Sequence, residues 1–294
     1  MLTWLFILVR IVANPLSNVF QKQLAERSAS PVFVIGLVHL CLALACLPWL
    51  WIRGGILVPA DVWINMLVAA TLAVAGNTLL VYALRSTDLS LLGPINAYKS
   101  VIGLIIGVFL IGEYPSLIGI TGILLIVAGS YFVVDRRVDQ PRHNAFVLFF
   151  REHGVQLRFA ALFLSATEAI FLKRAILLST PWTVFVLWSI LGVPLAGVAA
   201  LMVEKATIVE EAGSVRRSWG TYLALAMTTG LMQLTTVLTF GRFQVGYSLA
   251  LFQLSTIVSV LLGHRYFQER NVRKRLGGSV VMTIGAVLIV ISAS

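Results

Sequence analysis

The sequence predicts an all-α membrane protein whose ten transmembrane helices form two inverted five-helix repeats. Three observations lead to this fold class. The 294 residues are 59% hydrophobic and only 12% charged, whereas soluble domains average about 45–50% apolar and about 25% charged residues. The apolar residues gather in ten runs, each long enough to cross a bilayer core of about 30 Å. The second half of the chain also repeats motifs of the first half in the same order.

The ten runs are separated by short charged or Pro/Gly-containing breaks, and none alternates between polar and apolar residues as a barrel strand does. A backbone inside hydrocarbon must satisfy its own hydrogen bonds, so we expect each run to be a helix. Six of the seven tryptophans lie at the ends of runs, where indole rings prefer the membrane interface. In order, the runs span residues 2–20, 31–52, 62–84, 89–111, 115–134, 159–178, 181–203, 219–241, 245–266 and 276–292.

Two of the early runs have simple interpretations. The first lacks the basic start and small-residue cleavage site of a secretory signal, so we expect a retained helix. The second contains both cysteines, Cys41 and Cys46, at a depth where disulfide chemistry has little access. We therefore expect two packed thiols there.

The basic residues are distributed unequally among the loops. Sixteen Lys and Arg residues lie in the odd-numbered loops and four in the even-numbered breaks, which predicts that the odd-numbered loops are cytoplasmic and both termini are outside. We expect the cytoplasmic (inner) membrane, and three parts of the chain: a first repeat (1–134), a basic linker (135–158) and a second repeat (159–294). The apolar stretch 145–150 in the linker is expected to lie along the membrane surface.

The repeat is visible as pairs of matching residues at nearly constant offsets. Each half contains five runs, an odd number, so duplication places the second half upside down in the membrane. Such inverted repeats are typical of secondary transporters, which bind substrate between the repeats near the midplane. The pairs are Glu113 with Glu269, Gly122 with Gly278 and Gly129 with Gly285 at an offset of 156, Ser90 with Ser248 at 158, and Lys22 with Lys173 at 151.

These features resemble the EamA unit of the drug/metabolite transporter superfamily. The shared features are a five-helix unit with a polar first helix, Gly112-Glu113 closing the fourth helix, and a fifth helix punctuated by glycines. Two such units cover essentially the whole chain. The resemblance implies a ten-helix bundle, alternating access, and small metabolites such as amino acids, amines, nucleosides or drugs as cargo. Members commonly keep both termini in the cytoplasm, which departs from the charge count here.

Two ionisable residues lie in the middle of apolar runs, where a charge costs at least about 2.5–3.5 kcal/mol to insert and is usually retained for a reason. Glu168, in the sixth run, could carry a proton, anchor a cationic amine or form half of a buried ion pair. Lys99, in the fourth run, could hold a substrate carboxylate or phosphate, or could neutralise Glu168. The residues alone leave these alternatives open.

Other polar side chains follow helical stripes, which in membrane helices face the bundle interior or a wet cavity. In the first run Arg10, Asn14, Ser17 and Gln21 share one side. The eighth and ninth runs contain glutamines, and aromatic rings near this depth could cage a cationic amine. The predicted substrate-binding residues are Glu168, Lys99, Asn14, Asn96, Ser17, Gln233, Gln253, Tyr82 and Trp188.

No catalytic or cofactor motif accompanies these residues. The four histidines are scattered without the spacing of a zinc enzyme, and the sequence contains no Gly-x-x-x-x-Gly-Lys phosphate loop. We therefore expect no enzymatic activity, no cofactor and no metal site. The net charge of +10 lies in membrane loops, so it indicates orientation rather than nucleic acid binding.

We predict a secondary transporter that moves a small metabolite, such as an amino acid, an amine or a drug-like solute, by alternating access. Export is expected rather than uptake, with membrane lipid around the bundle and protons as the coupling ion to test. One alternative is a flippase for a lipid-linked intermediate, whose anionic head group would suit the basic loops. The other is a non-transporting membrane scaffold protein, which would leave the polar stripes unexplained. Substrate identity and oligomeric state are left undefined by the residues.

Overall fold

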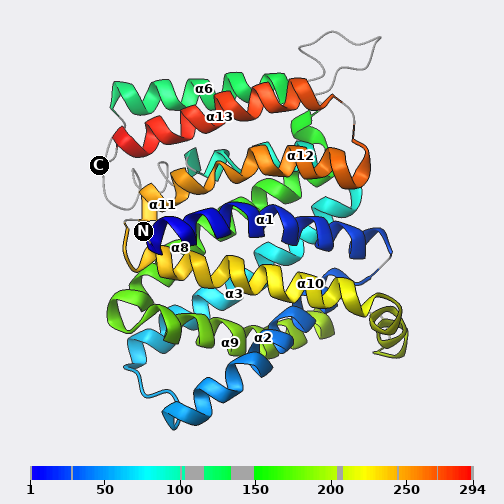
Figure 1. Ribbon diagram of the computed structural model, residues 1–294, viewed down its shortest axis with the longest axis vertical. Coiled ribbons are helices and arrows are strands. Elements are labelled where there is room, and N and C mark those ends of the chain that lie inside the picture. The colour runs from blue at the N-terminus through cyan, green and yellow to red at the C-terminus, as the bar shows by residue number, and fades with distance from the viewer. Residues whose placement is uncertain are drawn as a thin grey trace.

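The computed structural model describes residues 2–27, 29–99, 101–102, 116–133, 149–203, 208–243, 245–269 and 271–292, and its regular elements there are all helices (Figure 1). This confirms the all-helical fold class. The helices are α1 (Leu2–Glu26), α2 (Pro31–Arg53), α3 (Ala60–Ser86), α4 (Leu89–Ile95), α6 (Leu117–Val133), α8 (His153–Leu178), α9 (Pro181–Val203), α10 (Ile208–Phe240), α11 (Val245–Phe252), α12 (Ser255–Phe267) and α13 (Val272–Ser292).

Several of these helices are membrane spans by length and composition. In the described ranges, α1, α2, α3, α9 and α10 each contain a stretch long and apolar enough to cross a bilayer. Helix α8 has 26 residues, and its mainly apolar sequence carries Arg158, Glu168, Lys173 and Arg174. Large apolar side chains such as Leu8, Leu44 and Leu201 are exposed on the outside of the bundle, where lipid would cover them.

The helices pair across the two halves in antiparallel fashion. Helix α1 runs along α10, with Arg10 bonded to Thr236 near one end and Arg27 bonded to Ser218 near the other. Helix α3 runs along α8, and this pair is the repeat equivalent of the α1–α10 pair. Exchanging the two five-helix units exchanges these two pairs, which is the behaviour of an inverted repeat.

Two further pairs join equivalent helices, with α6 on α13 at one end of the long axis and α2 on α9 at the other (Figure 1). A Cβ added to Gly122 would lie 2.6 Å from the carbonyl oxygen of Gly285, and one added to Gly129 would lie 2.9 Å from that of Gly278. Each contact becomes the other when the halves are exchanged. The glycines thus let the two backbones touch, and the repeat inferred from the sequence has a structural basis.

The fourth and ninth apolar runs are interrupted at equivalent points. Helix α4 ends one residue after Pro94, which has no N–H to donate along a helix, and the chain turns at Asn96 before helical structure resumes. Helix α11 is followed by a turn at Gln253 before α12 begins. The side-chain amide of Asn96 donates to Oε1 of Gln253 at 3.3 Å. The two interruptions therefore meet inside the bundle.

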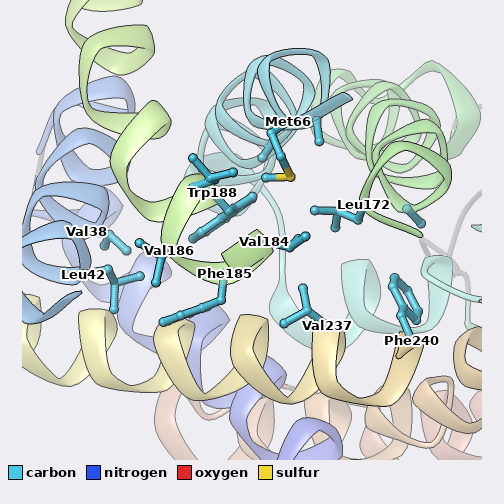
Figure 2. Packing of buried hydrophobic residues seen from close by; sticks show 14 of the residues in the cluster. Val38, Leu42, Met66, Leu172, Val184, Phe185, Val186, Trp188, Val237 and Phe240 are labelled. Carbon is cyan, nitrogen blue, oxygen red and sulfur yellow. The ribbon is translucent and has the colours of Figure 1, made fainter. Parts of the chain in front are cut away.

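The main apolar cluster surrounds α9 and is drawn in Figure 2. Trp188 of α9 is 1% exposed and lies beside Met66 of α3. Phe185, about one turn earlier, points toward α10, and Leu172 of α8 belongs to the same cluster. Because this cluster contacts α3, α8 and α10 together, it sets the spacing of three helices that line the central cavity.

The loops separate into two ends of the bundle. The start of α1 meets the loop after α10 through Thr3 and Arg242, and both chain ends lie on that side in Figure 1. At the other end Lys22 of α1 reaches Glu269 in the loop between α12 and α13. We call these the terminal face and the odd-loop face, because the described odd-numbered loops lie together at the second.

The start of α8 differs from the sequence expectation. The helix begins at His153, earlier than the apolar run at Phe159, so Arg158 belongs to the helix although the sequence assigns it to the linker. Hydropathy alone cannot detect a helix whose first turns carry charged side chains facing inward.

The linker is described only at its C-terminal end. Phe149 is buried and the ring of Phe150 lies 6.5 Å from that of Tyr98, centroid to centroid. These two rings pack on the bundle rather than along the membrane surface. Residues 145–148 of the predicted surface stretch, most of the linker and Gly112-Glu113 lie outside the described residues.

Candidate functional site

A polar cavity lies at the centre of the bundle between the two halves. It encloses about 870 Å³ of space between atoms, its open part included. Its walls come from α1, α3, α8, α10 and α11 and from the chain that follows α4. Helices α1 and α8 are repeat counterparts, as are α3 and α10, so each half contributes equivalent elements to one site. The described polar side chains in its wall are Arg10, Asn14, Ser17, Asn18, Gln21, Asn77, Asn96, Lys99, Arg158, Ser165, Glu168, Thr229, Gln233 and Thr236.

The polar stripe of α1 forms one wall of this cavity. Arg10, Asn14, Ser17 and Gln21 recur at the spacing of 3.6 residues per turn, and all four line the cavity. Ser17 satisfies its hydroxyl within the helix by donating to the carbonyl oxygen of Asn14 at 2.8 Å. The stripe is therefore directed at the interior, as its sequence pattern predicts.

Three cationic side chains reach the cavity from three different segments. Arg10 donates from Nε to Thr236 at 2.8 Å and lies over the ring of Phe252, 4.7 Å from its centroid. Arg158 of α8 donates to Oδ1 of Asn96 at 3.0 Å. Lys99 follows the interruption after α4 and lines the same space. Positive charge thus converges on one point from both halves.

Glu168 is the one carboxylate among the described lining residues. Its Oε1 accepts a hydrogen bond from the indole nitrogen of Trp188 at 3.1 Å, and the Trp188 ring is in turn held against His39 with centroids 4.2 Å apart. Among the described residues no ion pair joins Glu168 to Lys99 or Arg10. The direct Lys99–Glu168 pair, one of the alternatives that the sequence leaves open, is not formed in this structure.

Five lining atoms have no hydrogen-bond partner in the part of the chain that is described. They are Arg10 Nη1, Arg158 Nε, Gln233 Nε2, Gln21 Oε1 and Thr229 Oγ1. An unsatisfied buried polar group costs about 1–3 kcal/mol. A cluster of them around one cavity is therefore typical of a site whose hydrogen bonds are completed by a ligand or by solvent.

Most of the residues predicted as substrate-binding lie together in this wall: Glu168, Lys99, Asn14, Asn96, Ser17 and Gln233. Gln253 lies behind the wall and contacts it through Asn96, and Trp188 lies behind Glu168. Tyr82 is on α3 and does not line the cavity. The two aromatic residues are thus not arranged as a cage around the cavity.

Sequence reasoning left two central residues out of the predicted set. Arg158 was assigned to the linker because its charge ended the apolar run, although its side chain is only 7% exposed. Arg10 was noted in the stripe of α1 but was not among the predicted substrate-binding residues. Their helical spacing from cavity residues could have identified them from the sequence. Arg158, for example, precedes Ser165 by two helical turns on one side of α8.

Comparison with known proteins agrees with this architecture. The sequence profile of the EamA-like transporter family matches residues 2–135. The first half of the chain belongs to the EamA-like transporter family. One solved crystal structure superposes with a TM-score of 0.65 at 14% sequence identity, covering 97% of this chain and 95% of the other, so the fold likeness extends over both halves. No curated protein matches the chain.

Membership in the EamA-like family implies an integral membrane transporter of small solutes and a protein that is not an enzyme. It also removes the scaffold alternative, under which the polar stripes had no explanation. Neither the solute nor the direction of its movement follows from membership.

The odd-loop face of this EamA-like transporter carries a buried ion-pair network. Glu269 accepts from Nζ of Lys22 at 2.9 Å and from the backbone N–H groups of Leu89 and Ser90 at 2.8 and 2.7 Å. Arg275 joins it to Asp88, at 3.6 Å from Glu269 and 3.0 Å from Asp88. The network binds α1, the start of α4 and α13 to one another at this end of the bundle.

The electrostatics of Glu269 follow from these contacts. Burial by itself would raise the pKa of the Glu269 carboxyl, but hydrogen bonds from Ser90 and Lys22 and the charge of Lys22 outweigh it and hold the pKa below its ordinary value. Glu269 is therefore ionised at neutral pH and acts as a permanent anionic clamp. Its repeat counterpart Glu113 lies outside the described residues.

Proposed function

We propose that the chain is a secondary transporter that carries a small metabolite through the central cavity by alternating access. The observation that supports this most is the position of the cavity between inverted halves, at the level where two interrupted runs meet at Asn96 and Gln253. In secondary transporters, such halves rock around a fixed site near the midplane.

The cavity wall supports a polar, water-soluble cargo, such as an amino acid, an amine or a drug-like solute with polar groups. Donors and acceptors outnumber aromatic rings in the wall, and several of them have no described partner. A purely apolar molecule would leave these groups unpaired at a cost of about 1–3 kcal/mol each. Export rather than uptake remains our prediction.

We further propose that protons are the coupling ion and that Glu168 carries them. It is the sole carboxylate among the described lining residues, and intramembrane carboxylates commonly form the proton relays of transporters. Its hydrogen bond from Trp188 fixes its position without neutralising it.

The test is uptake into sealed proteoliposomes with a panel of amino acids, amines and sugars, each with and without a proton gradient. We expect at least one solute to accumulate with the wild-type chain. Glu168→Gln should lose this uptake, because the amide keeps the shape but cannot ionise, while remaining folded in the membrane. Glu26→Gln is the matched control, since Glu26 is exposed at the end of α1, and it should transport normally.

Two results would overturn this proposal. Equal uptake by Glu168→Gln and the wild type under a proton gradient would remove Glu168 as the carrier. The second result would be that no water-soluble solute is taken up while a fluorescent lipid-linked analogue is translocated. The protein would then be a flippase for a lipid-linked intermediate.

A further inference from the structure

We propose that the substrate of the central cavity is a small organic anion, with a carboxylate or phosphate group held by Arg10, Lys99 and Arg158. This inference rests on the proposed function, because it names the chemical class of the solute for the same site. It contrasts with the cationic amine that Glu168 alone would favour.

The charges that line the cavity are unbalanced. Three cations and one carboxylate line the cavity, so the described wall has an excess of two positive charges. Burying a charge without a counter-charge is expensive, and buried charges are generally paired. The described part of the chain supplies no ion pair to any of these three cations. An anionic substrate supplies the missing charge.

Most of the polar atoms without a described partner in the cavity wall are hydrogen-bond donors. Arg10 Nη1, Arg158 Nε and Gln233 Nε2 are N–H donors without a described partner, whereas Gln21 Oε1 is an acceptor and the Thr229 hydroxyl can donate or accept. A carboxylate or phosphate offers only acceptor oxygens, which match this excess of donors. Arginine is also the residue best suited to planar or bidentate recognition of these groups.

The two arginines are already positioned to bind an acid group. Each guanidinium is already held by one bond, Arg10 to Thr236 and Arg158 to Asn96, and each keeps further N–H groups for a ligand. Arg10 is also supported from one side by the ring of Phe252. Cations positioned in this way lose little side-chain freedom on binding, which favours affinity.

Glu168 then has a defined place in the same site. Its carboxylate, held by Trp188, can accept a hydrogen bond from a hydroxyl group on the same substrate. The bound molecule would thus present its acid group to the three cations and a hydrogen-bond donor to Glu168. These two different contacts would fix its orientation in the cavity.

The experiment is ligand-induced thermal stabilisation of the full chain purified in detergent. The probes are malate, glycerol 3-phosphate, leucine and putrescine at about 10 mM, each compared with sodium chloride of equal ionic strength. A ligand present at several times its Kd should raise Tm by roughly 2–4 °C. We expect this rise in Tm with malate or with glycerol 3-phosphate. A rise with malate identifies a carboxylate ligand, and a rise with glycerol 3-phosphate identifies a phosphate ligand.

Variants locate the effect. Arg158→Gln should abolish the rise, Arg158→Lys should retain part of it, and Arg216→Gln, an exposed arginine of α10, should leave it unchanged. The proposal is overturned if neither anion raises Tm, if leucine or putrescine raises it more than both anions, or if Arg158→Gln responds like the wild type. Stabilisation by putrescine that Glu168→Gln abolishes would overturn the anionic substrate while leaving the cavity as the transport site.

Discussion

At the scale of single residues, Glu168 and Trp188 connect the apolar core to the polar cavity. Trp188 is buried among apolar side chains and still satisfies its indole N–H, because that group reaches the Glu168 carboxylate at 3.1 Å. The carboxylate is therefore positioned from behind by Trp188, a member of the apolar cluster drawn in Figure 2. Such support is needed where a charged group must hold its orientation inside a membrane protein.

Replacing this tryptophan should destabilise the fold. Trp188→Phe keeps a large ring in the cluster but removes the donor, so we expect a loss of about 1–3 kcal/mol from the lost bond to a charged group. The measurement is thermal or denaturant unfolding in detergent, with Trp182→Phe as control because Trp182 is 48% exposed. Equal stability of the two variants would show that the Glu168 bond contributes nothing.

A site residue can be recognised from the sequence where a polar side chain interrupts an apolar run. Asn14, Lys99 and Glu168 were visible for this reason, and the structure brings them to one cavity. Arg158 was missed because it lies at the beginning of its run, where a charge looks like a loop residue. Whether Gln253 contacts substrate was also beyond the sequence, since its contact with Asn96 depends on how two distant turns meet.

At the scale of elements, interruptions and glycines define the site more than helix length does. The break after α4 follows from Pro94 and can be predicted from the chain. The equivalent break between α11 and α12 contains no proline within residues 245–267, so only tertiary packing reveals it. The glycine pairs between α6 and α13 were predicted as a repeat, but their direct contact required the structure.

The contact between α6 and α13 can be tested by adding one methyl group. Gly122→Ala would place a Cβ 2.6 Å from the carbonyl oxygen of Gly285, so the helices must separate, at a cost of about 1–3 kcal/mol from overpacking. Gly277→Ala in α13 is the control, because nothing lies within 4 Å of its added Cβ. Unfolding in detergent should show the first variant destabilised and the second unchanged or slightly stabilised, and the reverse order would contradict this packing.

The ion-pair network at the odd-loop face predicts a specific acid sensitivity. The folded state holds the pKa of Glu269 below its ordinary value. Its contribution to stability is therefore complete above about pH 4.5 and is lost as the pH falls through the lower pKa of the folded state.

Glu269→Gln removes this contribution and leaves Lys22 buried without its anion, so we expect a loss of about 3–5 kcal/mol at neutral pH. The variant should also show a shallower decline of Tm below about pH 4.5 than the wild type. Parallel Tm curves for the two proteins across the acid range would exclude Glu269 as the source of acid sensitivity.

At the scale of the whole molecule, the inverted repeat follows from sequence offsets, while orientation depends on charge. Lys22, Arg158 and Arg275 were counted among sixteen basic loop residues, but all three are buried in the bundle. Thirteen therefore remain for the odd-loop face, against four in the even-numbered breaks. The asymmetry persists, and it still predicts that the odd-loop face is cytoplasmic.

Fusion reporters test this orientation. A reporter active only in the periplasm, attached after Ser294, should be active, and one active only in the cytoplasm should be silent. The reporters should give the reverse result when placed at the exposed position Arg27 on the odd-loop face. A cytoplasmic C-terminus would show that the family habit prevails over the charge count.

In alternating access, one cavity between inverted halves opens in turn to the two sides of the membrane. The most direct measurement labels Asn77→Cys with a membrane-impermeant maleimide from each side of sealed proteoliposomes, after Cys41 and Cys46 are changed to alanine. Asn77 lines the cavity, and its side-chain amide donates to the carbonyl oxygen of Ala73 within its own helix. We predict labelling from both sides, slowed by the transported solute. Labelling from one side alone, unaffected by solute, would contradict alternating access through this cavity.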